Sequence, residues 1–309
     1  MEKALHLKPV IMRVSGGIGN QLFQYALGRA LTLESGAPLL LDISSYIKPK
    51  PGEALRAYTL PRFNIQGEIA AHSDFGSIGV PDPADQSFIA KLKRRLIRAR
   101  ESDEAFHQRR IILEGAFNFI PDILNVKGNA FLAGVWQSEK YFKDHADQIR
   151  KDLVLKESLS SKALEIQKQM RESQSVAVHV RRGDQVSDPD LVKKHGLLTD
   201  EYYSSALKYM KSKLSDPRFF VFSDEIGWVK QNMGFGADAV YVSESNLPDY
   251  EELMLMASCK HQIIAKSSFS WWGAWLNQNP NKIVIAPRQR FASDSQEAKD
   301  LIPDSWIEL

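Results

Sequence analysis

The sequence predicts an α/β protein built from two Rossmann-like domains, each with its own parallel sheet. Two observations support this prediction. The chain has 309 residues, which is about the length of two average domains. In both halves, short apolar runs typical of strands alternate with longer segments in which apolar residues recur at helical spacing. We expect a first domain at residues 1–160 and a second domain at residues 161–309.

The first domain opens with a strand–turn–helix–strand unit. A strand at 10–14 leads into the glycine-rich turn SGGIGN, and a helix follows at 21–34. A second apolar run at 38–41 ends in Asp42. This order predicts a parallel sheet. A further helix is expected at 88–100, and further strands at 111–119 and 131–136.

In the second half, expected strands and helices alternate, which predicts a second parallel sheet. A helix at 144–170, broken near 158–161, is expected to connect the two domains. Strands are expected at 176–180, 219–222, 239–242, 262–265 and 282–286, and helices at 200–214, 224–233, 248–258 and 268–277.

The composition argues against several classes of protein. Hydrophobic residues make up 43% of the chain and charged residues 25%, which is ordinary for a globular fold. The formal net charge of +2 is too small to indicate a nucleic-acid-binding protein. The N-terminus does not resemble a signal peptide, and no apolar stretch reaches the roughly 20 residues that span a bilayer. Cys259 is the single cysteine, so we expect a soluble, cytoplasmic protein without disulfides.

Polar residues follow three of the expected strands in the second domain, where ligands of open α/β sheets bind. Two adjacent arginines offer planar donors that match phosphate oxygens. An acid at a strand end can accept hydrogen bonds from a guanine edge, and small hydroxyl residues that open a helix form an anion site. Together they predict a nucleotide diphosphate site. The residues are Arg181, Arg182 and Asp184 after VAVHV, Asp224 after FFVFS, and Ser267 and Ser268 before FSWW.

The same residues also have purely structural interpretations. Arg181 and Arg182 beside Asp184 can form a salt-bridge turn at the surface. Ser223 and Asp224 can cap the helix that follows them. Three tryptophans of the expected last helix are spaced to face a packing surface rather than a sugar; they are Trp271, Trp272 and Trp275.

The glycine-rich turn of the first domain at 16–20 allows two interpretations. It nearly matches the dinucleotide fingerprint, with Asp42 in the place of a ribose-binding acid, although Leu22 replaces the third glycine. This interpretation predicts an oxidoreductase that uses NAD or NADP. In the alternative, the backbone at Gly17, Gly19 and Asn20 approaches the phosphates of a sugar donor or the acceptor.

Five segments resemble, in the same order, the bacterial α-1,2-fucosyltransferases of surface-glycan synthesis. The resemblance covers residues 13–287, and its HVRRGD element is similar to one in α-1,6- and protein O-fucosyltransferases. It implies two Rossmann-like domains facing a cleft (the GT-B fold), GDP-fucose as donor, inversion at the fucose carbon, no metal, and a β-galactoside acceptor. The segments are GGIGNQLFQYALGRAL, GVWQSEKYF, HVRRGD, FVFSDE and SSFSWWGAWLN.

The resemblance also implies roles for individual residues. Arg181 would hold the β-phosphate of the donor, His179 and Asp224 would lie at the guanine, and Ser267 and Ser268 would lie near phosphate. Gly17, Gly19 and Asn20 would face the pyrophosphate from the first domain. Where the family has asparagine before the serines this chain has Lys266, and Gln185 replaces a tyrosine after HVRRGD.

An inverting transfer needs a group that accepts the proton of the acceptor hydroxyl. Asp184 is the first candidate, because it lies closest to Arg181 in the sequence, and an arginine partner would make it a weaker base. Asp188, Asp190 and His195 remain open. The triplet Asp188-Pro189-Asp190 could instead hold a metal ion, but no second group of ligands accompanies it, so no metal is expected.

The expected helix at 88–100 is basic and amphipathic. The segment KLKRRLIRAR, Lys91 to Arg100, has Leu92, Leu96 and Ala99 on one helical face. This pattern is typical of a helix that lies on a membrane surface, and also of a solvated helix edge. The sequence leaves both interpretations open: a cytoplasmic enzyme that contacts the inner face of the membrane through this segment, or one with a charged surface helix. A sugar-binding protein without catalysis is a further alternative.

Overall fold

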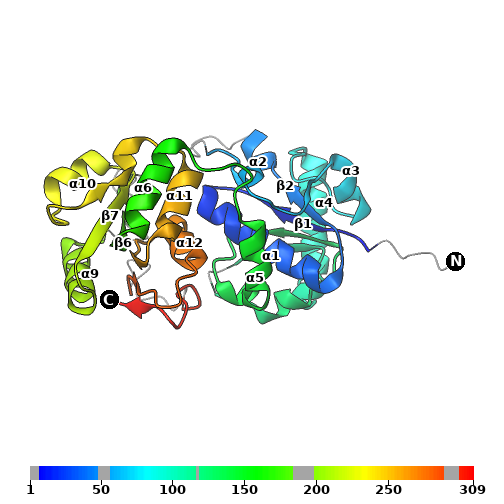
Figure 1. Ribbon diagram of the computed structural model, residues 1–309. Coiled ribbons are helices and arrows are strands. Elements are labelled where there is room, and N and C mark those ends of the chain that lie inside the picture. The colour runs from blue at the N-terminus through cyan, green and yellow to red at the C-terminus, as the bar shows by residue number, and fades with distance from the viewer. Residues whose placement is uncertain (1–6, 48–55, 116–117, 184–197, 289–298) are drawn as a thin grey trace. The chain divides into compact units, whose positions relative to one another are not determined.

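The computed structural model describes residues 7–47, 56–115, 118–183, 198–288 and 299–309. The chain forms two compact units, Met1–Lys156 and Glu157–Leu309 (Figure 1). Each unit contains one sheet, and all strands of both sheets pair in parallel. The α/β class with two parallel-sheet domains is confirmed. Among the described residues, no helix is long and apolar enough to cross a membrane.

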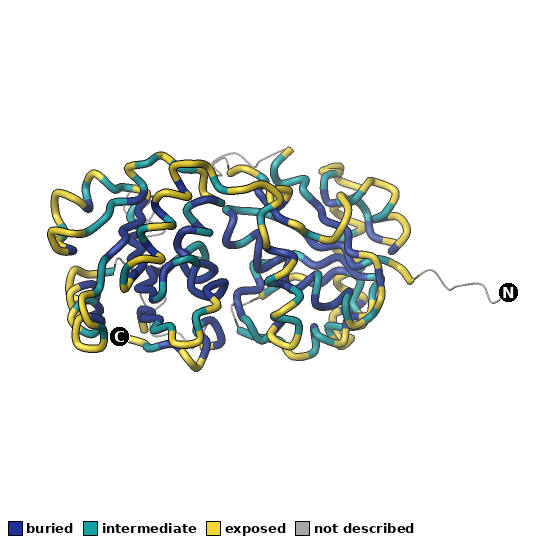
Figure 2. Tube along the Cα trace, in the orientation of Figure 1, coloured by how far each residue is buried: buried dark blue, intermediate teal, exposed yellow. Residues whose placement is uncertain are grey.

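The sheet of the first unit has the strand order β3-β2-β1-β5-β4. Apart from Arg13 and Asp42 at the ends of β1 and β2, its central strands consist of apolar residues that are mostly buried, as Figure 2 shows by their dark blue colour. A sheet covered on both faces needs such continuous apolar strands. The strands are β1 Val10–Arg13, β2 Leu39–Asp42, β3 Glu68–Ile69, β4 Ile111–Leu113 and β5 Ala130–Ala133, and the helices are α1 Ile18–Ser35, α2 Ser44–Ile47, α3 His72–Ser77, α4 Phe88–Arg100 and α5 Ala146–Asp152.

The sheet of the second unit has the strand order β11-β10-β9-β6-β7-β8. The expected strands and helices of this half are all present, with ends shifted by a few residues. The strands are β6 Gln174–Val180, β7 Pro217–Ser223, β8 Val240–Tyr241, β9 His261–Ile263, β10 Val284–Ala286 and β11 Ile307–Glu308, and the helices are α6 Ser161–Arg171, α9 Asp200–Lys213, α10 Ile226–Asn232, α11 Asp249–Ser258 and α12 Ser268–Leu276.

Alternate residues of β6 belong to two different cores. Val176, Val178 and Val180 pack with α9, whereas Ala177 packs with α6 and α11 on the other face. Strand geometry therefore directs His179 to the α6 and α11 face.

Three expected elements of the first half and of the connection differ from the prediction. The strands expected at 111–119 and 131–136 end at Leu113 and Ala133, which form the last pair of β4 and β5. The helix expected at 144–170 is divided into α5 and α6, with the break at 153–160 around the expected position.

Candidate functional site

The carboxyl ends of β6 and β7 lie side by side, because Val180 pairs with Ser223 in the parallel register. Arg181 follows β6 and Asp224 follows β7, so the two residues lie next to each other at the carboxyl edge of the sheet. Arg181 Nη1 lies 2.9 Å from Asp224 Oδ2, and the two side chains are 22% and 24% exposed. A half-buried arginine is thus fixed by a carboxylate at the sheet edge where ligands of this fold bind.

The second arginine has a different environment. Arg182 donates through its backbone N–H to Asp224 Oδ1 at 3.0 Å and through Nε to Glu225 Oε2 at 3.0 Å. Its guanidinium lies 3.2 Å from the centroid of the Trp228 ring. These contacts hold Arg182 against α10, and the cation–π contact was not predicted from the sequence.

The turn after β6 has room only for a glycine at position 183. A Cβ placed there would overlap the carboxylate of Asp224. Any larger residue would displace the group that orients Arg181. Neither Ser223 nor Asp224 is the N-cap of the helix that follows: α10 begins at Ile226 with Glu225 as its N-cap, and Ser223 Oγ accepts a hydrogen bond from the Glu225 N–H at 3.0 Å.

His179 is buried in the unit and neutral. Its ring lies 5.5 Å from the ring of Phe269, and its backbone carbonyl accepts a hydrogen bond from Tyr203 at 3.1 Å. Burial, and then the charge of Arg181, lower the pKa of His179 to about 3. Its Nδ1 has no hydrogen-bond partner among the described residues. A buried imidazole with an open polar atom is suited to bind a ligand group.

The start of α12 is the third predicted part of the site. Ser267 is the N-cap of this helix, and its hydroxyl accepts a hydrogen bond from the Phe269 N–H at 3.3 Å. The contact between Phe269 and His179 places this helix start beside β6. Lys266 is buried, only 7% exposed. The three strand ends singled out in the sequence thus lie within one region of the second unit.

The three tryptophans of α12 form part of the core, as predicted. Trp271 lies 5.2 Å from Trp272 and 6.3 Å from Trp275 between ring centroids, and all three are buried. The Trp271 indole donates to the Leu301 carbonyl at 2.8 Å. They hold α12 in place.

In the first unit, two of the recognised segments meet. Asn20 Oδ1 accepts from Gln137 Nε2 at 2.8 Å, and Gln24 Nε2 donates to the Gly134 carbonyl at 2.7 Å. Gly17 is the N-cap residue of α1. The GGIGN turn is therefore tied to the GVWQ turn at the carboxyl edge of this sheet.

Glu114, which no sequence motif indicated, also lies at this edge and positions its backbone. Its carboxylate accepts from the backbone N–H groups of Val135 at 2.6 Å and Trp136 at 3.0 Å. Burial raises the pKa of Glu114 above its usual range, and these two hydrogen bonds oppose the shift. The available signal was an acid directly after a strand.

Asp42 does not match the ribose-binding acid of a dinucleotide site. The residue is only 4% exposed, and its Oδ1 accepts a hydrogen bond from the Ser44 N–H at 3.0 Å. Its carboxylate also lies near Arg13, which leaves it facing the protein rather than a ligand.

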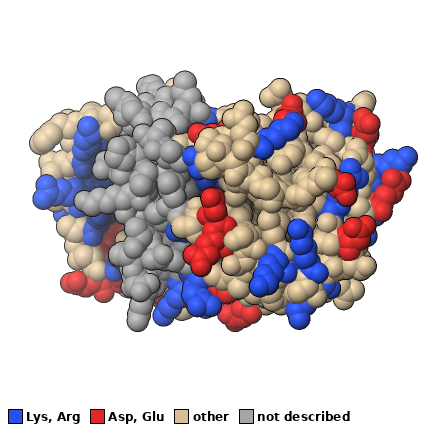
Figure 3. Space-filling model, turned by 90° about the vertical axis from the view of Figure 1, so that its left-hand side faces the viewer, with Lys and Arg blue, Asp and Glu red and all other residues tan. Residues whose placement is uncertain are grey.

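Asp184, Asp188, Asp190 and His195 lie outside the described residues, as does Gln185. The described part of the chain contains no group of three or more potential metal ligands. On the face shown in Figure 3, basic and acidic side chains of the described residues are interspersed.

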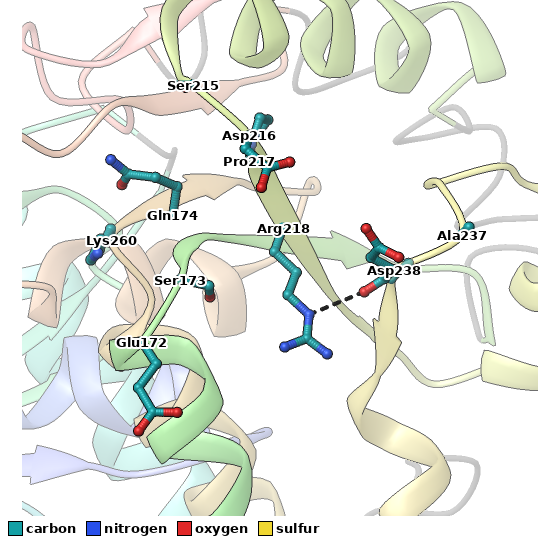
Figure 4. Close-up of a pocket in the computed structure, with 11 residues that line it drawn as sticks. Glu172, Ser173, Gln174, Ser215, Asp216, Pro217, Arg218, Ala237, Asp238 and Lys260 are labelled. Atoms are coloured by element: carbon teal, nitrogen blue, oxygen red, sulfur yellow. Dashed lines mark hydrogen bonds between the residues drawn. The ribbon is translucent and has the colours of Figure 1, made fainter.

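A hollow of about 780 Å³ lies at the opposite edge of the second sheet, where β6 and β7 begin (Figure 4). Arg218 points across it and donates to the Asp238 carbonyl at 3.2 Å. This hollow lies at the amino ends of β6 and β7, whereas Arg181 lies at their carboxyl ends.

Family comparison defines the class of protein to which this site belongs. Residues 110–309 match the model of glycosyl transferase family 11. An alpha-1,2-colitosyltransferase of Escherichia coli is 33% identical over 97% of this chain and 98% of that protein. The O-antigen biosynthesis glycosyltransferase WbnK of Escherichia coli is 31% identical over 96% of this chain and 99% of that protein. The protein is a glycosyltransferase, and the oxidoreductase alternative finds no support.

More specifically, the chain belongs to glycosyl transferase family 11. Human galactoside alpha-(1,2)-fucosyltransferase 1 is 25% identical over 47% of this chain and 42% of that protein. Among solved structures, the NodZ alpha-1,6-fucosyltransferase soaked with GDP-fucose is 18% identical, covers 87% of this chain and 92% of that chain, and has a TM-score of 0.48.

Proposed function

We propose that the enzyme transfers L-fucose from GDP-fucose to the 2-hydroxyl of a β-galactoside, with inversion, during synthesis of a surface glycan such as an O-antigen. The observation that carries the proposal is the pair of Arg181 and Asp224 at the joined ends of β6 and β7. The five fucosyltransferase-like segments support it. The relatives named for α-1,2 transfer and for O-antigen synthesis support the linkage and the biological role.

In this proposal the second unit binds the nucleotide. Arg181 contacts the β-phosphate, and the helix start at Ser267 and Ser268 adds backbone N–H groups that favour a negative charge. His179 and Asp224 lie on the guanine side. Arg182 has a structural role, because its hydrogen bonds and its contact with Trp228 stabilise the turn after β6.

Departure of GDP leaves negative charge on the β-phosphate, which a fixed guanidinium stabilises. The fucosyl carbon gains positive character, and the acceptor hydroxyl attacks from the opposite face. Asp184 is our first candidate for the group that takes the hydroxyl proton, with Asp188, Asp190 and His195 as alternatives. Gly17, Gly19 and Asn20 are proposed to bind the pyrophosphate or the acceptor through the first unit.

Analysis of the product tests the reaction. The purified enzyme, GDP-fucose and a β-galactoside should yield an α-1,2-linked product, identified by NMR. GDP-colitose belongs in the same assay, because colitose is fucose without its 3-hydroxyl and the 33% identical relative is named for that sugar. A product from GDP-colitose alone would replace fucose in the proposal, and no product from either donor would refute it.

We propose that transfer needs no metal ion, because Arg181 and the start of α12 can carry the charge of the leaving group. Activity should therefore persist in excess EDTA, measured as initial rates of GDP release. A loss of activity that manganese or magnesium restores would contradict this and would make Asp188-Pro189-Asp190 the first candidate for a metal site.

We also propose that the enzyme works in the cytoplasm at the inner face of the membrane, with Lys91–Arg100 as a peripheral contact. The naming of one relative for O-antigen biosynthesis supports this location. Fractionation of the producing cells tests it: the protein should be recovered partly with membranes at low salt and released by high salt.

A further inference from the structure

Helix α4 is attached to the first unit by a narrow face. Ser87 caps the helix, its hydroxyl accepting from the Ala90 N–H at 3.2 Å. Ala90 is buried, and Ile97 packs against the core of that unit. These two residues lie two turns apart on the same side of the helix. One line of contacts therefore fixes its orientation.

The opposite side of α4 exposes large apolar side chains. The exposed fractions are 79% for Phe88, 65% for Ile89, 43% for Leu92 and 48% for Leu96. At 3.6 residues per turn these four side chains fall within an arc of about 100°, turned away from Ala90. Four of the eleven exposed large apolar residues of the described chain thus lie on one helix of 13 residues.

Basic side chains lie on both sides of this apolar surface. On the helix, Lys91, Arg95 and Arg98 lie along one side of it, and Lys93 and Arg100 lie along the other. All five are exposed, and none forms an ion pair with another described residue. Their charges are therefore available to an anionic partner.

Arg94 differs from these five residues. It donates to the backbone carbonyls of Asp82 at 2.6 Å and Asp85 at 2.9 Å. Its guanidinium thereby ties the helix to the preceding loop. Arg94 belongs to the structure of the unit and should be left unchanged in a test of the surface.

A hollow of about 630 Å³ adjoins the same helix. Val80, Leu96 and Ile97 form part of its apolar wall, Lys93 and Arg100 are the basic residues that line it, and Asp85 is an acidic residue in its lining. The apolar wall and the two cations continue the chemistry of the exposed surface.

We infer that α4 docks the enzyme on an anionic phospholipid bilayer, with Phe88, Ile89, Leu92 and Leu96 in the interface and the flanking cations at the lipid phosphates. An apolar stripe bordered by lysine and arginine is the pattern of a helix that lies in a membrane surface. The charge complementarity selects anionic lipid over a neutral bilayer. The inference deepens the proposed peripheral contact and rests on it for the identity of the partner.

Sedimentation with vesicles tests this inference. The full-length protein should bind vesicles of equal parts phosphatidylcholine and phosphatidylglycerol, and should ignore phosphatidylcholine alone. The variant K91Q/R95Q/R98Q should bind at least about tenfold more weakly, since each cation near the surface contributes. F88S/L92S should also lose binding, because it removes the apolar contact but no charge.

The matched control is K208Q/K211Q/K213Q, which removes three exposed cations from α9 in the second unit. It should bind anionic vesicles like the native protein. Equal loss in the control would show a non-specific charge effect and would overturn the inference. So would native protein that ignores anionic vesicles, or an F88S/L92S variant that only separates a dimer in gel filtration.

Transfer to a soluble oligosaccharide is measured on every variant. The α4 variants should keep native rates, because α4 carries none of the proposed site residues. Loss of vesicle binding with intact transfer supports the inference. Intact vesicle binding without any transfer would instead refute the proposed reaction, so the two failures are distinguishable.

Discussion

At the end of β6, two neighbouring arginines have different surroundings. Arg181 pairs with the carboxylate of Asp224 and remains 22% exposed, whereas Arg182 contacts Asp224, Glu225 and the Trp228 ring. The sequence predicts the pair as phosphate ligands without distinguishing them. Only the tertiary contacts distinguish Arg181, the candidate phosphate ligand, from Arg182, which stabilises the turn. Trp228 is 46 positions along the chain from Arg182, and no local pattern links them.

The buried imidazole of His179 should make the second unit less stable in acid. Its folded pKa is about 3 and its usual value is 6.5. Below pH 6.5 the unfolded chain gains a proton that the folded unit does not bind, so stability falls with pH until about pH 3. Between pH 6.5 and 5.5 the loss should be about 1 kcal/mol.

Denaturant unfolding of the native protein and of His179→Gln at both pH values measures this effect. Tryptophan fluorescence suits the experiment, because five of the six tryptophans lie in the second unit. The native protein should lose about 1 kcal/mol more than the variant. Equal pH dependence of the two proteins would show that His179 is not buried in its neutral form.

At the scale of elements, the apolar runs that form β6 and β7 were readable in the sequence. Apolar residues on both faces predict strands covered on each side, and the polar residues that follow mark the ligand edge. The short strands β3 and β11 were not predicted, since neither lies within a longer apolar run such as the one that contains β8. The tie between Gln137 and Asn20 was also missed, because it joins segments 117 positions apart.

Helix α12 provides a prediction about packing. Trp271 is buried and its ring contacts other tryptophans, so Trp271→Leu should lower the free energy of unfolding of the second unit by about 3 kcal/mol. The KM of the folded variant for the donor should stay native. Denaturant unfolding and steady-state kinetics check the two parts. A large rise in KM at unchanged stability would mean that the indole binds substrate.

At the scale of the whole molecule, the sequence predicts two parallel-sheet units from length and strand–helix alternation alone, and the structure has both. The division falls between Lys156 and Glu157, in the segment that separates α5 from α6. The proposed roles are divided in a related way: the second unit binds the guanine and the β-phosphate, and the first unit supplies the membrane contact and the GGIGN turn that faces the pyrophosphate or the acceptor. What the sequence could not provide is the exposure of α4, since the same amphipathic pattern describes a helix that packs on its apolar side.

Ligand-dependent thermal unfolding tests the central claim most directly, namely that the second sheet binds a guanosine diphosphate through Arg181. GDP should raise the unfolding midpoint of the native protein, because a ligand that binds only the folded state stabilises it. NAD and NADP should have no effect, and UDP a smaller one. Arg181→Lys should lose most of the GDP shift, since a point charge does not replace the planar donor fork. Arg218→Lys, the same change at the opposite edge of the sheet, should keep the shift. Stabilisation by NAD or NADP, or a full GDP shift in Arg181→Lys, would contradict the account.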